Sequence, residues 1–585
     1  MKLNFLAACM KKLFRFNYGT NNTRYHVLPL SDEGMKPSPQ RTLIKKLLVL
    51  LGPLVAVPLL FFGPEYRCLF SIIFLSTYWI GEAFPIGVTS LFPLALYPIL
   101  QIVPSKQISP VYFKDSIVLF MCTLIMAMAV EATGLHRRIA LKLLTKVGAK
   151  QPVMLLGFMC ITSFISFFVS DTACTALMCP TAVALLMSMS DAVQHLKEDH
   201  RKPKPPPDDA TVAEKLRIDD MTPQDAGFCK ALILACAHAS LIGGTAIITS
   251  TGPNLVFREN IHKRYPEGQV TMTYLQWMVF AIPPMFVYLL ASYIILVCYF
   301  MGPSTFARWF ERPSKEEAHL KKLIEKNIQT MYEDLGDVSW GEKSVFVFFI
   351  LLIGSWISRD PGFTPGWGDL LPHRNFISDS VSGVLISCIL FVWPKDPFDP
   401  IDPMAPILKW TDMKSKFSWS CTLLIGAGYA ISEGVDKSGL SRLISCGMKN
   451  IFVGMSSLPL QLTVTTIIVI MTEFASNVST GSIFIPISLG VAESMGVHPL
   501  YLALPTTVAC SFAFMLPIST PPNAVVYDTK VISMVEMIVC GFLLNIACIL
   551  ITSLNMNTWT YFIFSLNIFP ENIVISSENS SYPVC

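Results

Sequence analysis

Two short polar motifs each occur twice in this chain, in the same order and inside apolar runs. Ser170-Asp171-Thr172 precedes Ser250-Thr251-Gly252-Pro253-Asn254, and Ser476-Asn477-Val478 precedes Ser519-Thr520-Pro521-Pro522-Asn523. Small hydroxyl and amide residues beside glycine and proline at membrane depth predict broken helices. Matching broken helices in two halves of a chain point to the binding site of a transporter.

Composition places the chain in a membrane. Hydrophobic residues make up 52% and charged residues 15% of the sequence, whereas an ordinary soluble domain has roughly 25% charged residues. The mean hydropathy is +0.52, which disfavours one large soluble core. A spanning helix needs roughly 20 apolar residues. Runs of suitable length are 47–63, 83–105, 151–170, 231–257, 269–307, 450–472, 495–527 and 537–570. We therefore expect an all-α polytopic membrane protein.

The distribution of Lys and Arg predicts the orientation. Residues 1–46 hold nine of these side chains, whereas residues 531–585 hold none. By the positive-inside rule, the N-terminus should be cytoplasmic and the C-terminus extracellular. Asn579 lies in a glycosylation sequon, Asn579-Ser580-Ser581, on the expected outer side. Ends on opposite sides require an odd number of spans, and we expect about eleven plus two re-entrant hairpins.

Charge and cysteine content suggest no further partner. The net charge of +3 is accounted for by topology, so no nucleic-acid partner is expected. The 16 cysteines are scattered and show no metal-ligand spacing, which argues against a zinc site or a disulfide framework. The carboxylates in apolar runs are not paired in sequence and no catalytic motif occurs, so an enzyme is not expected.

The internal repeat extends beyond the polar motifs. Gly134-Leu135 and Gly439-Leu440 each follow an apolar run, at an offset of 439 − 134 = 305, close to the 476 − 170 = 306 of the Ser-Asx motifs. The Pro-Asn motifs are offset by only 523 − 254 = 269, because the first half contains a polar insertion at 191–225. Equivalent halves that start from opposite sides would form an inverted repeat, with each Ser-Asx motif at the tip of a re-entrant hairpin.

These patterns divide the chain into segments. They are a cytoplasmic N-terminal segment at 1–46, the first part of repeat one at 47–190 with a hairpin at 152–190, a cytoplasmic insertion at 191–225, the second part of repeat one at 226–307, a cytoplasmic linker at 308–343, repeat two at 344–570 with a hairpin near 453–495, and an extracellular tail at 571–585. Residues 132–150 are expected to form an amphipathic helix at the membrane interface.

The repeated segments suit a cation and an anion together. Broken helices free backbone carbonyls, and Ser, Thr and Asn add side-chain oxygens, which are ligands for a cation. Helix N-termini beside them favour an anion. The segments 243–254 and 517–523 both fit this description. Close packing through small residues is the alternative reading of either segment alone.

At these residues the chain resembles the divalent-anion/sodium symporters, a family of sodium-coupled dicarboxylate, citrate and sulfate transporters. The resemblance runs from about Leu43 to about Phe569. The stretches that carry it are 78–85, 135–141, 147–150, 243–254, Thr472-Glu473-Phe474-Ala475-Ser476-Asn477-Val478 and Thr520-Pro521-Pro522-Asn523. It implies a homodimer of scaffold and transport domains, an elevator mechanism, and at least two sodium ions with no organic cofactor. Val478 resembles the eukaryotic dicarboxylate and citrate members, which places the chain closest to the eukaryotic sodium/dicarboxylate cotransporters, in the plasma membrane.

The resemblance also assigns residues to the site. A first sodium site would contain Ser166, Ser170, Asp171, Gly244 and Asn254, and a second would contain Thr472, Ser476, Asn477 and Asn523. The substrate would contact Ser170, Asp171, Thr172, Ser250, Thr251, Ser476, Asn477, Val478, Thr520 and Pro521.

Two positions depart from the family pattern. The family usually has Asn at the position of Asp171 and Gly at the position of Ser250. Like charges at about 4 Å repel by roughly 4 kcal/mol at an effective dielectric of 20. Asp171 must therefore be protonated, neutralised by a cation, or facing a less negative substrate. Ser250 is expected to narrow the cavity and restrict the backbone.

The sequence thus predicts a sodium-coupled symporter of di- or tricarboxylates such as succinate or citrate. A sodium-coupled transporter of sulfate or another anion, altered by Asp171 and Ser250, is the alternative within this class. An ion channel or a non-transporting membrane receptor is the alternative outside it. A channel would show a continuous polar lining or rings of charge, whereas here the polar residues gather in two clusters.

Overall fold

The chain is helical throughout the part that can be described. The computed structural model describes residues 53–570 except 81–83, 145–149, 197–211, 217, 219–220, 267, 304, 306–325, 327–328, 331, 362–364, 371, 374–375, 441–442, 444–455 and 518. Within these residues there is no strand, only an isolated bridge between Pro394 and Pro406. The prediction of an all-α fold is confirmed.

The helices of the first half are α3 (Pro64–Ile80), α4 (Ile86–Thr89), α5 (Phe92–Ile99), α6 (Ser105–Ile108), α7 (Asp115–Thr133), α8 (Leu135–Leu144), α9 (Gln151–Ser166), α10 (Asp171–Leu196), α11 (Val212–Leu216), α12 (Pro223–Gly243), α13 (Gly252–Arg264) and α14 (Tyr274–Leu296). The helices of the second half are α17 (Trp340–Arg359), α18 (Asp379–Leu390), α19 (Trp410–Lys416), α20 (Trp419–Ser438), α22 (Ser457–Thr472), α23 (Asn477–Ser494), α24 (Pro499–Ala509), α25 (Pro521–Asp528), α26 (Met534–Asn557) and α27 (Trp559–Ile563).

Five helical stretches in the described residues are long and apolar enough to cross a membrane, by length and composition. They are Ser105–Thr133, Pro223–Gly243, Tyr274–Met301, Trp340–Arg359 and Met534–Ile563. Shorter apolar helices accompany them, including α9, the first part of α10, and α22. The chain is therefore polytopic, and the number of full spans stays a prediction.

One expected segment differs from the structure. The apolar run 83–105 is not one helix, because the chain turns at Ser90 and Leu91 between α4 and α5, and α5 carries Pro93 and Pro98. The insertion at 191–225 is helical at both ends, since α10 continues to Leu196 and α12 begins at Pro223. The amphipathic helix expected at 132–150 is α8, which starts after Gly134 and is described to Leu144.

The two halves share the same local geometry. Helix α7 ends at Gly134 and α20 ends at Gly439, and both glycines are left-handed, with φ of 75° and 80°. Each half then contains a helical hairpin, α9–α10 or α22–α23, in which the second helix begins within the Ser-Asx motif. Each half also contains a helix pair, α12–α13 or α24–α25, interrupted before the Pro-Asn motif.

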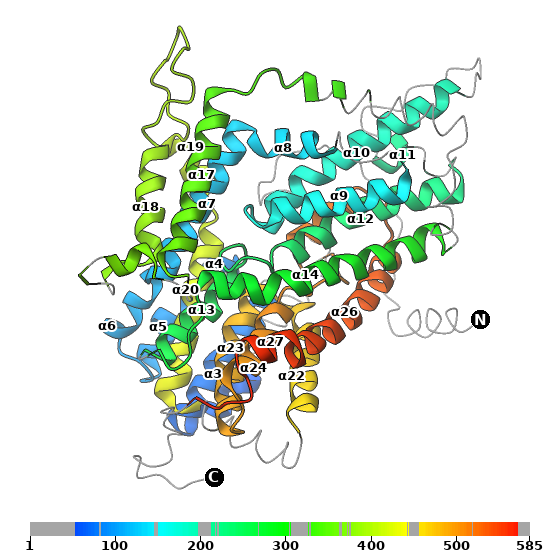
Figure 1. Ribbon diagram of the computed structural model, residues 1–585. Helices are drawn as coiled ribbons and strands as arrows, with labels where there is room; N and C mark the ends of the chain where they lie inside the picture. Colours follow the sequence, from blue (N-terminus) through cyan, green and yellow to red (C-terminus); the bar gives the residue numbers. More distant parts are fainter. Residues whose placement is uncertain are drawn as a thin grey trace, which may run out of the picture.

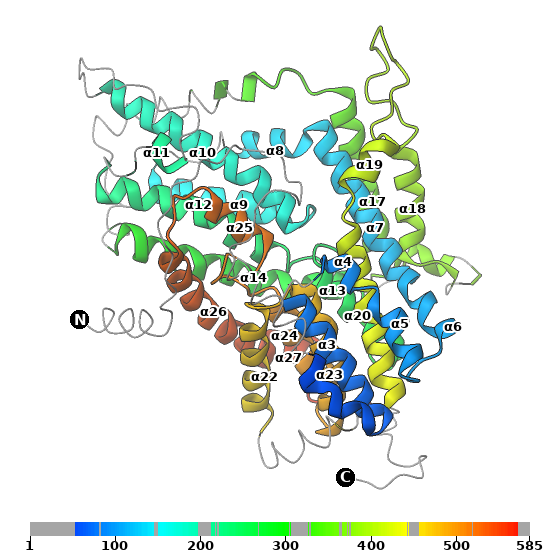
Figure 2. The same ribbon diagram turned by 180° about the vertical axis from the view of Figure 1, so that it is seen from behind.

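The views in Figures 1 and 2 show where three groups of helices lie. Helices α9, α10 and α12 lie side by side on one side of the molecule, and α7, α17 and α18 lie on the other, with α8 between the two groups (Figure 1). Helices α22, α23 and α24 gather in another part of the molecule, near α26 (Figure 2). The polar motifs of both halves therefore sit where helices begin or break inside this assembly.

Candidate cation and substrate site

The turns of the two hairpins use the same hydrogen bond. In the first hairpin the Ser166 hydroxyl donates to Asp171 Oδ1 at 3.2 Å, and in the second the Thr472 hydroxyl donates to Asn477 Oδ1 at 3.1 Å. In both, the donor is the last residue of the first helix and the acceptor is the first residue of the second helix. This bond closes the turn over the four residues between them.

The same two hydroxyls also join each hairpin to the next broken helix. The Ser166 hydroxyl lies 2.7 Å from the carbonyl of Ser240 in α12, and the Thr472 hydroxyl lies 2.6 Å from the carbonyl of Cys510 after α24. In the first half, the Ser240 hydroxyl adds a return bond to the Asp171 carbonyl at 2.7 Å. Each hairpin tip is thus fixed against the broken helix of its own half.

The asparagine of each Pro-Asn motif holds the broken segment open. The Asn254 amide nitrogen lies 3.5 Å from the carbonyl of Gly244 and 3.0 Å from that of Ile247. The Asn523 amide makes the same two contacts, at 2.8 Å and 3.1 Å, with carbonyls also ten and seven residues earlier. A side chain has replaced the helical hydrogen bonds that these carbonyls would otherwise make.

Four buried oxygens near these contacts have no hydrogen-bond partner within the described part of the chain. They are Asn254 Oδ1, Asn523 Oδ1, Thr251 Oγ1 and Thr520 Oγ1. The two asparagines are both 0% exposed, and the four atoms form two matched pairs at the 269-residue offset (523 − 254 = 520 − 251). A buried polar group without a partner costs about 1–3 kcal/mol. Buried oxygens of this kind suit the coordination of a small cation, and the two hydroxyls suit donation to an anion.

Helix N-termini converge on the same region. Helices α10, α13, α23 and α25 begin at or next to the four motifs, and their first N–H groups favour negative charge. The halves also meet here. A Cβ added to Gly252 would lie 2.3 Å from Val478 Cγ2, so only glycine allows the second hairpin tip to approach α13 so closely. Val478 thereby lies beside the first Pro-Asn motif.

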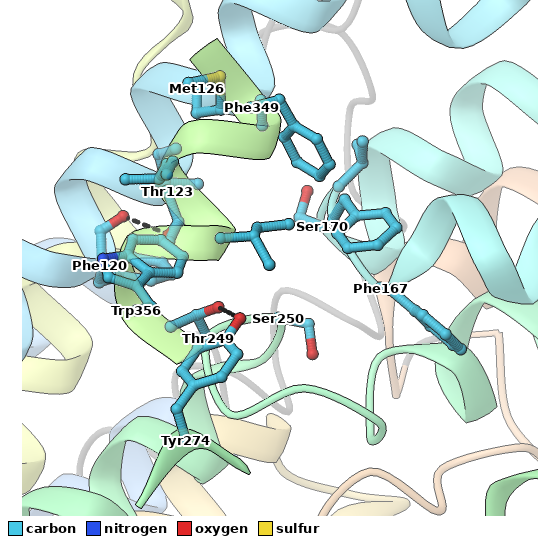
Figure 3. A pocket seen from close by; sticks show the side chains of 16 residues that line it. Phe120, Thr123, Met126, Phe167, Ser170, Thr249, Ser250, Tyr274, Phe349 and Trp356 are labelled. Carbon is cyan, nitrogen blue, oxygen red and sulfur yellow. Dashed lines mark hydrogen bonds between the residues drawn. The ribbon is translucent and has the colours of Figure 1, made fainter. Parts of the chain in front are cut away.

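A cavity of about 40 Å³ opens beside the first hairpin tip, against α7 and α17 (Figure 3). Aromatic side chains, among them Phe120, Phe167 and Trp356, form part of its wall, and Ser170 and Ser250 also line it. It is too small for a dicarboxylate in this arrangement of the helices.

Ser250 does not narrow this cavity with its hydroxyl. That hydroxyl donates to the carbonyls of Gly244 and Ile247, and Figure 3 shows it directed away from the cavity. Ser519 occupies the same position in the second half and donates to the Leu516 carbonyl at 2.6 Å, the distance found for Ser250 and Ile247. Ser250 thus makes a hydrogen bond that is repeated in the second half, and this bond stabilises the broken segment.

Asp171 lies against the backbone of the broken segment. A Cβ added to Gly244 would lie 2.2 Å from Asp171 Oδ1, so the glycine leaves room for this carboxylate. None of the ion pairs in the described residues involves Asp171. The structure thus brings Asp171 and Gly244 together, as the predicted first site requires.

Glu473 is a site residue that the sequence reasoning missed. Its carboxylate is 3% exposed and accepts from the backbone N–H of Phe514 at 2.9 Å, of Met515 at 3.1 Å and of Leu516 at 3.3 Å. The Asn545 amide adds a further bond at 2.8 Å. Glu473 therefore stabilises the second broken segment through hydrogen bonds to its backbone. A lone carboxylate within an apolar segment is a signal that could have identified it.

The remaining predicted residues are less constrained. Thr172 and Pro521 are exposed in this structure. Ser170 Oγ accepts from the N–H of Ala173 at 3.4 Å, and Ser476 Oγ accepts from that of Ser479 at 3.2 Å, so both serines act as helix caps. Asn579 lies outside the described residues.

Comparison with known proteins gives consistent matches over nearly the whole chain. The family described as the sodium:sulfate symporter transmembrane region matches residues 42–566. An uncharacterised transporter of Caenorhabditis elegans is 43% identical over 92% of this chain and 96% of its own length. The human Na(+)/dicarboxylate cotransporter 3 is 36% identical over 90% of this chain and 94% of its own. The rat Na(+)/citrate cotransporter is 34% identical over 90% and 96%. Among solved structures, the YdaH transporter of Alcanivorax borkumensis aligns at a TM-score of 0.48 and 12% identity over 90% of this chain and all of its own.

Proposed function

Because the chain belongs to the sodium:sulfate symporter family, it is a sodium-coupled transporter and not an enzyme, and we propose that it carries di- or tricarboxylates such as succinate or citrate. The names of the mammalian relatives support this substrate class. The observation in this chain that carries the proposal is the matched set of unpartnered oxygens on Thr251, Asn254, Thr520 and Asn523.

Sodium would be the first part of the cargo. Asn254 and Asn523 each offer an amide oxygen that no described protein group uses. At each hairpin tip, Oδ1 of Asp171 or Asn477 already accepts one hydroxyl from the preceding helix. We assign a first cation site to Ser166, Ser170, Asp171, Gly244 and Asn254, and a second to Thr472, Ser476, Asn477 and Asn523. Two sites of similar construction support coupling to at least two sodium ions per cycle.

The organic anion would lie between these two sites. Thr251 and Thr520 each occupy the N-cap position of a helix, and in the described residues neither hydroxyl bonds the helix or has another partner. One such donor from each half, beside a positive helix end, suits a ligand with two separated anionic groups. Thr172, Ser250, Val478 and Pro521 would complete the contact surface.

The movement and assembly of the carrier are part of the same proposal. We infer that the group α9–α14 with α22–α26 moves as a transport domain against a scaffold that contains α7, α17 and α18, by an elevator mechanism in a homodimer. The N-terminus would be cytoplasmic and the C-terminus extracellular, in the plasma membrane. A tag within 571–585 should be accessible from outside intact cells, with Asn579 glycosylated, whereas a tag within 197–211 should require permeabilisation. Outside labelling of 197–211 would contradict this orientation.

Uptake of labelled succinate, citrate and sulfate into cells that express the chain tests the substrate directly. Each anion is measured in sodium and in potassium at equal ionic strength, against cells without the chain. Sodium-dependent uptake of succinate or citrate is the expected result. Uptake of sulfate alone would favour the alternative anion. Uptake that continues unchanged in potassium would exclude sodium coupling.

A further inference from the structure

The two cation sites are alike in their hydrogen bonds and differ in charge. The acceptor across the first hairpin turn is the carboxylate of Asp171, and the acceptor across the second is the neutral amide of Asn477. The second half therefore serves as an internal comparison for the first, because equivalent hydrogen bonds contact a carboxyl group in one half and an amide in the other.

Among the described residues, one hydroxyl and one backbone segment lie against the Asp171 carboxyl group. Ser166 donates one hydroxyl to Oδ1, and the backbone of Gly244 lies close to the same atom. In the described part of the chain, no lysine or arginine pairs with it. The Asn254 amide, which bonds the Gly244 carbonyl, keeps its own oxygen without a partner and fully buried. A carboxylate and an unused amide oxygen thus flank the same backbone.

We propose that Asp171 makes the two cation sites unequal, so that the first site holds sodium more tightly than the second and holds it without a bound anion. This inference rests on the proposed function. An isolated charge in a low-dielectric site is costly unless it is paired, and a cation at the first site supplies that pairing. The second site has no such charge among its proposed ligands, so its cation depends more on the negative charge of the substrate.

A purely structural role for Asp171 is the competing explanation. An acidic residue at the first position of α10 stabilises that helix through the helix dipole. Such a contribution does not depend on which monovalent cation is present. The two roles are therefore separated by comparing sodium with potassium.

The test uses the purified full-length protein in detergent, without substrate. Thermal unfolding and binding of labelled sodium are followed as sodium replaces potassium at constant ionic strength. We expect Asp171→Asn to raise the half-saturating sodium concentration at least about tenfold, with an unchanged melting temperature in potassium alone. The matched variant Asn477→Asp should add a second tight sodium-binding phase. Asp171→Asn should also take up a doubly charged anion with a lower KM, because a like charge has been removed.

The outcomes separate the two proposals. Unchanged sodium saturation in Asp171→Asn, or equal loss of stability in sodium and potassium, would overturn the inference and leave sodium-driven uptake by the unmodified chain intact. If Asp171→Asn does not fold, Asn477→Asp decides the question, and the absence of a second tight phase would count against the inference. No sodium effect on the unmodified chain, together with no sodium-dependent uptake, would overturn the proposed function as well.

Discussion

The two halves of the molecule stabilise their hairpin turns and broken helices with the same hydrogen bonds, but they place their carboxylates at different positions. Both close a hairpin turn with a hydroxyl, and both hold a broken segment open with an asparagine bonded to carbonyls ten and seven residues earlier. The first half puts its carboxylate, Asp171, at the hairpin tip, and the second puts Glu473 behind the broken segment. Position 473 corresponds to Phe167 in the first half (473 − 306 = 167). These repeated hydrogen bonds form what we call the polar frame. It occurs in both halves because the free backbone groups of a broken helix in a membrane need partners. The position of the carboxylate, in contrast, differs between the halves.

The helices that follow the broken segments differ in the same way. Helix α13 carries a series of ion pairs with other helices, namely Arg258 with Asp379, Lys263 with Glu433, and Arg264 with Glu493. Within the described residues, helix α25 makes no ion pair. The first half is thus tied electrostatically to α18, α20 and α23, whereas α25 is held by packing and hydrogen bonds.

The largest effect is expected from removing the asparagine of either frame. Asn254→Ala and Asn523→Ala should each reduce sodium-driven uptake by at least about a hundredfold. Each leaves two carbonyls without a partner, at about 1–3 kcal/mol apiece, and removes a proposed cation ligand. Uptake is normalised to surface expression, with Asn555→Ala as the control, because Asn555 of α26 is buried and its amide donates to Thr560 of α27, away from the proposed site. If only one of the two variants lost activity, the halves would not contribute equally to the site.

Breaking the charge network of α13 should come next. The Arg258 side chain pairs with Asp379, which also accepts from Arg359 Nε at 2.5 Å, and Asp379 is 1% exposed. Removing one partner of a buried pair typically costs 3–5 kcal/mol, so Arg258→Ala should melt at a clearly lower temperature. Lys530→Ala, after α25, is the matched control, because Lys530 is exposed, lies 5.0 Å from the Tyr527 ring and takes part in none of the ion pairs in the described residues. Equal melting temperatures for the two variants would remove this difference between the halves.

Glu473→Gln should have an intermediate effect that is confined to the second half. The substitution keeps the shape of the side chain and removes the charge that accepts from Phe514, Met515 and Leu516. Hydrogen bonds to charged groups contribute about 1.5–3 kcal/mol, so the segment that carries the second site should loosen. We expect weaker sodium activation of uptake with little change in tight sodium binding at the first site. Loss of both in parallel would show that Glu473 supports the whole fold.

The sequence predicted the frame and missed much of what holds it. Repeated motifs at matching offsets identified the hairpins and the broken segments, because glycine, proline and small polar residues dictate local backbone geometry. The same reasoning did not find the bonds of Glu473 to the backbone or the pairing of Arg258 with Asp379, since both depend on which distant segments pack together. It placed Ser250 at the cavity wall, where this serine does lie, but it did not find that the Ser250 hydroxyl bonds the broken segment in the same way as that of Ser519. The resemblance to a known family predicted which residues bind sodium and substrate. Comparison of the two halves shows which contacts of the site are shared and which differ.

The smallest effect should come from the two left-handed glycines, which test whether the halves are equivalent away from the site. Gly134 and Gly439 end α7 and α20 at φ of 75° and 80°, and nothing lies within 4 Å of a Cβ added to either. Alanine at either position therefore meets only the backbone cost of the left-handed conformation, about 1–2 kcal/mol. Asparagine, which visits this conformation more readily, should cost less at both positions. Melting temperatures of Gly134→Ala and Gly439→Ala should fall by similar amounts. A much larger fall for Gly134→Ala would mean that the turn before α8 contributes more to stability than the matching turn at Gly439. The two halves would then be equivalent only around the site.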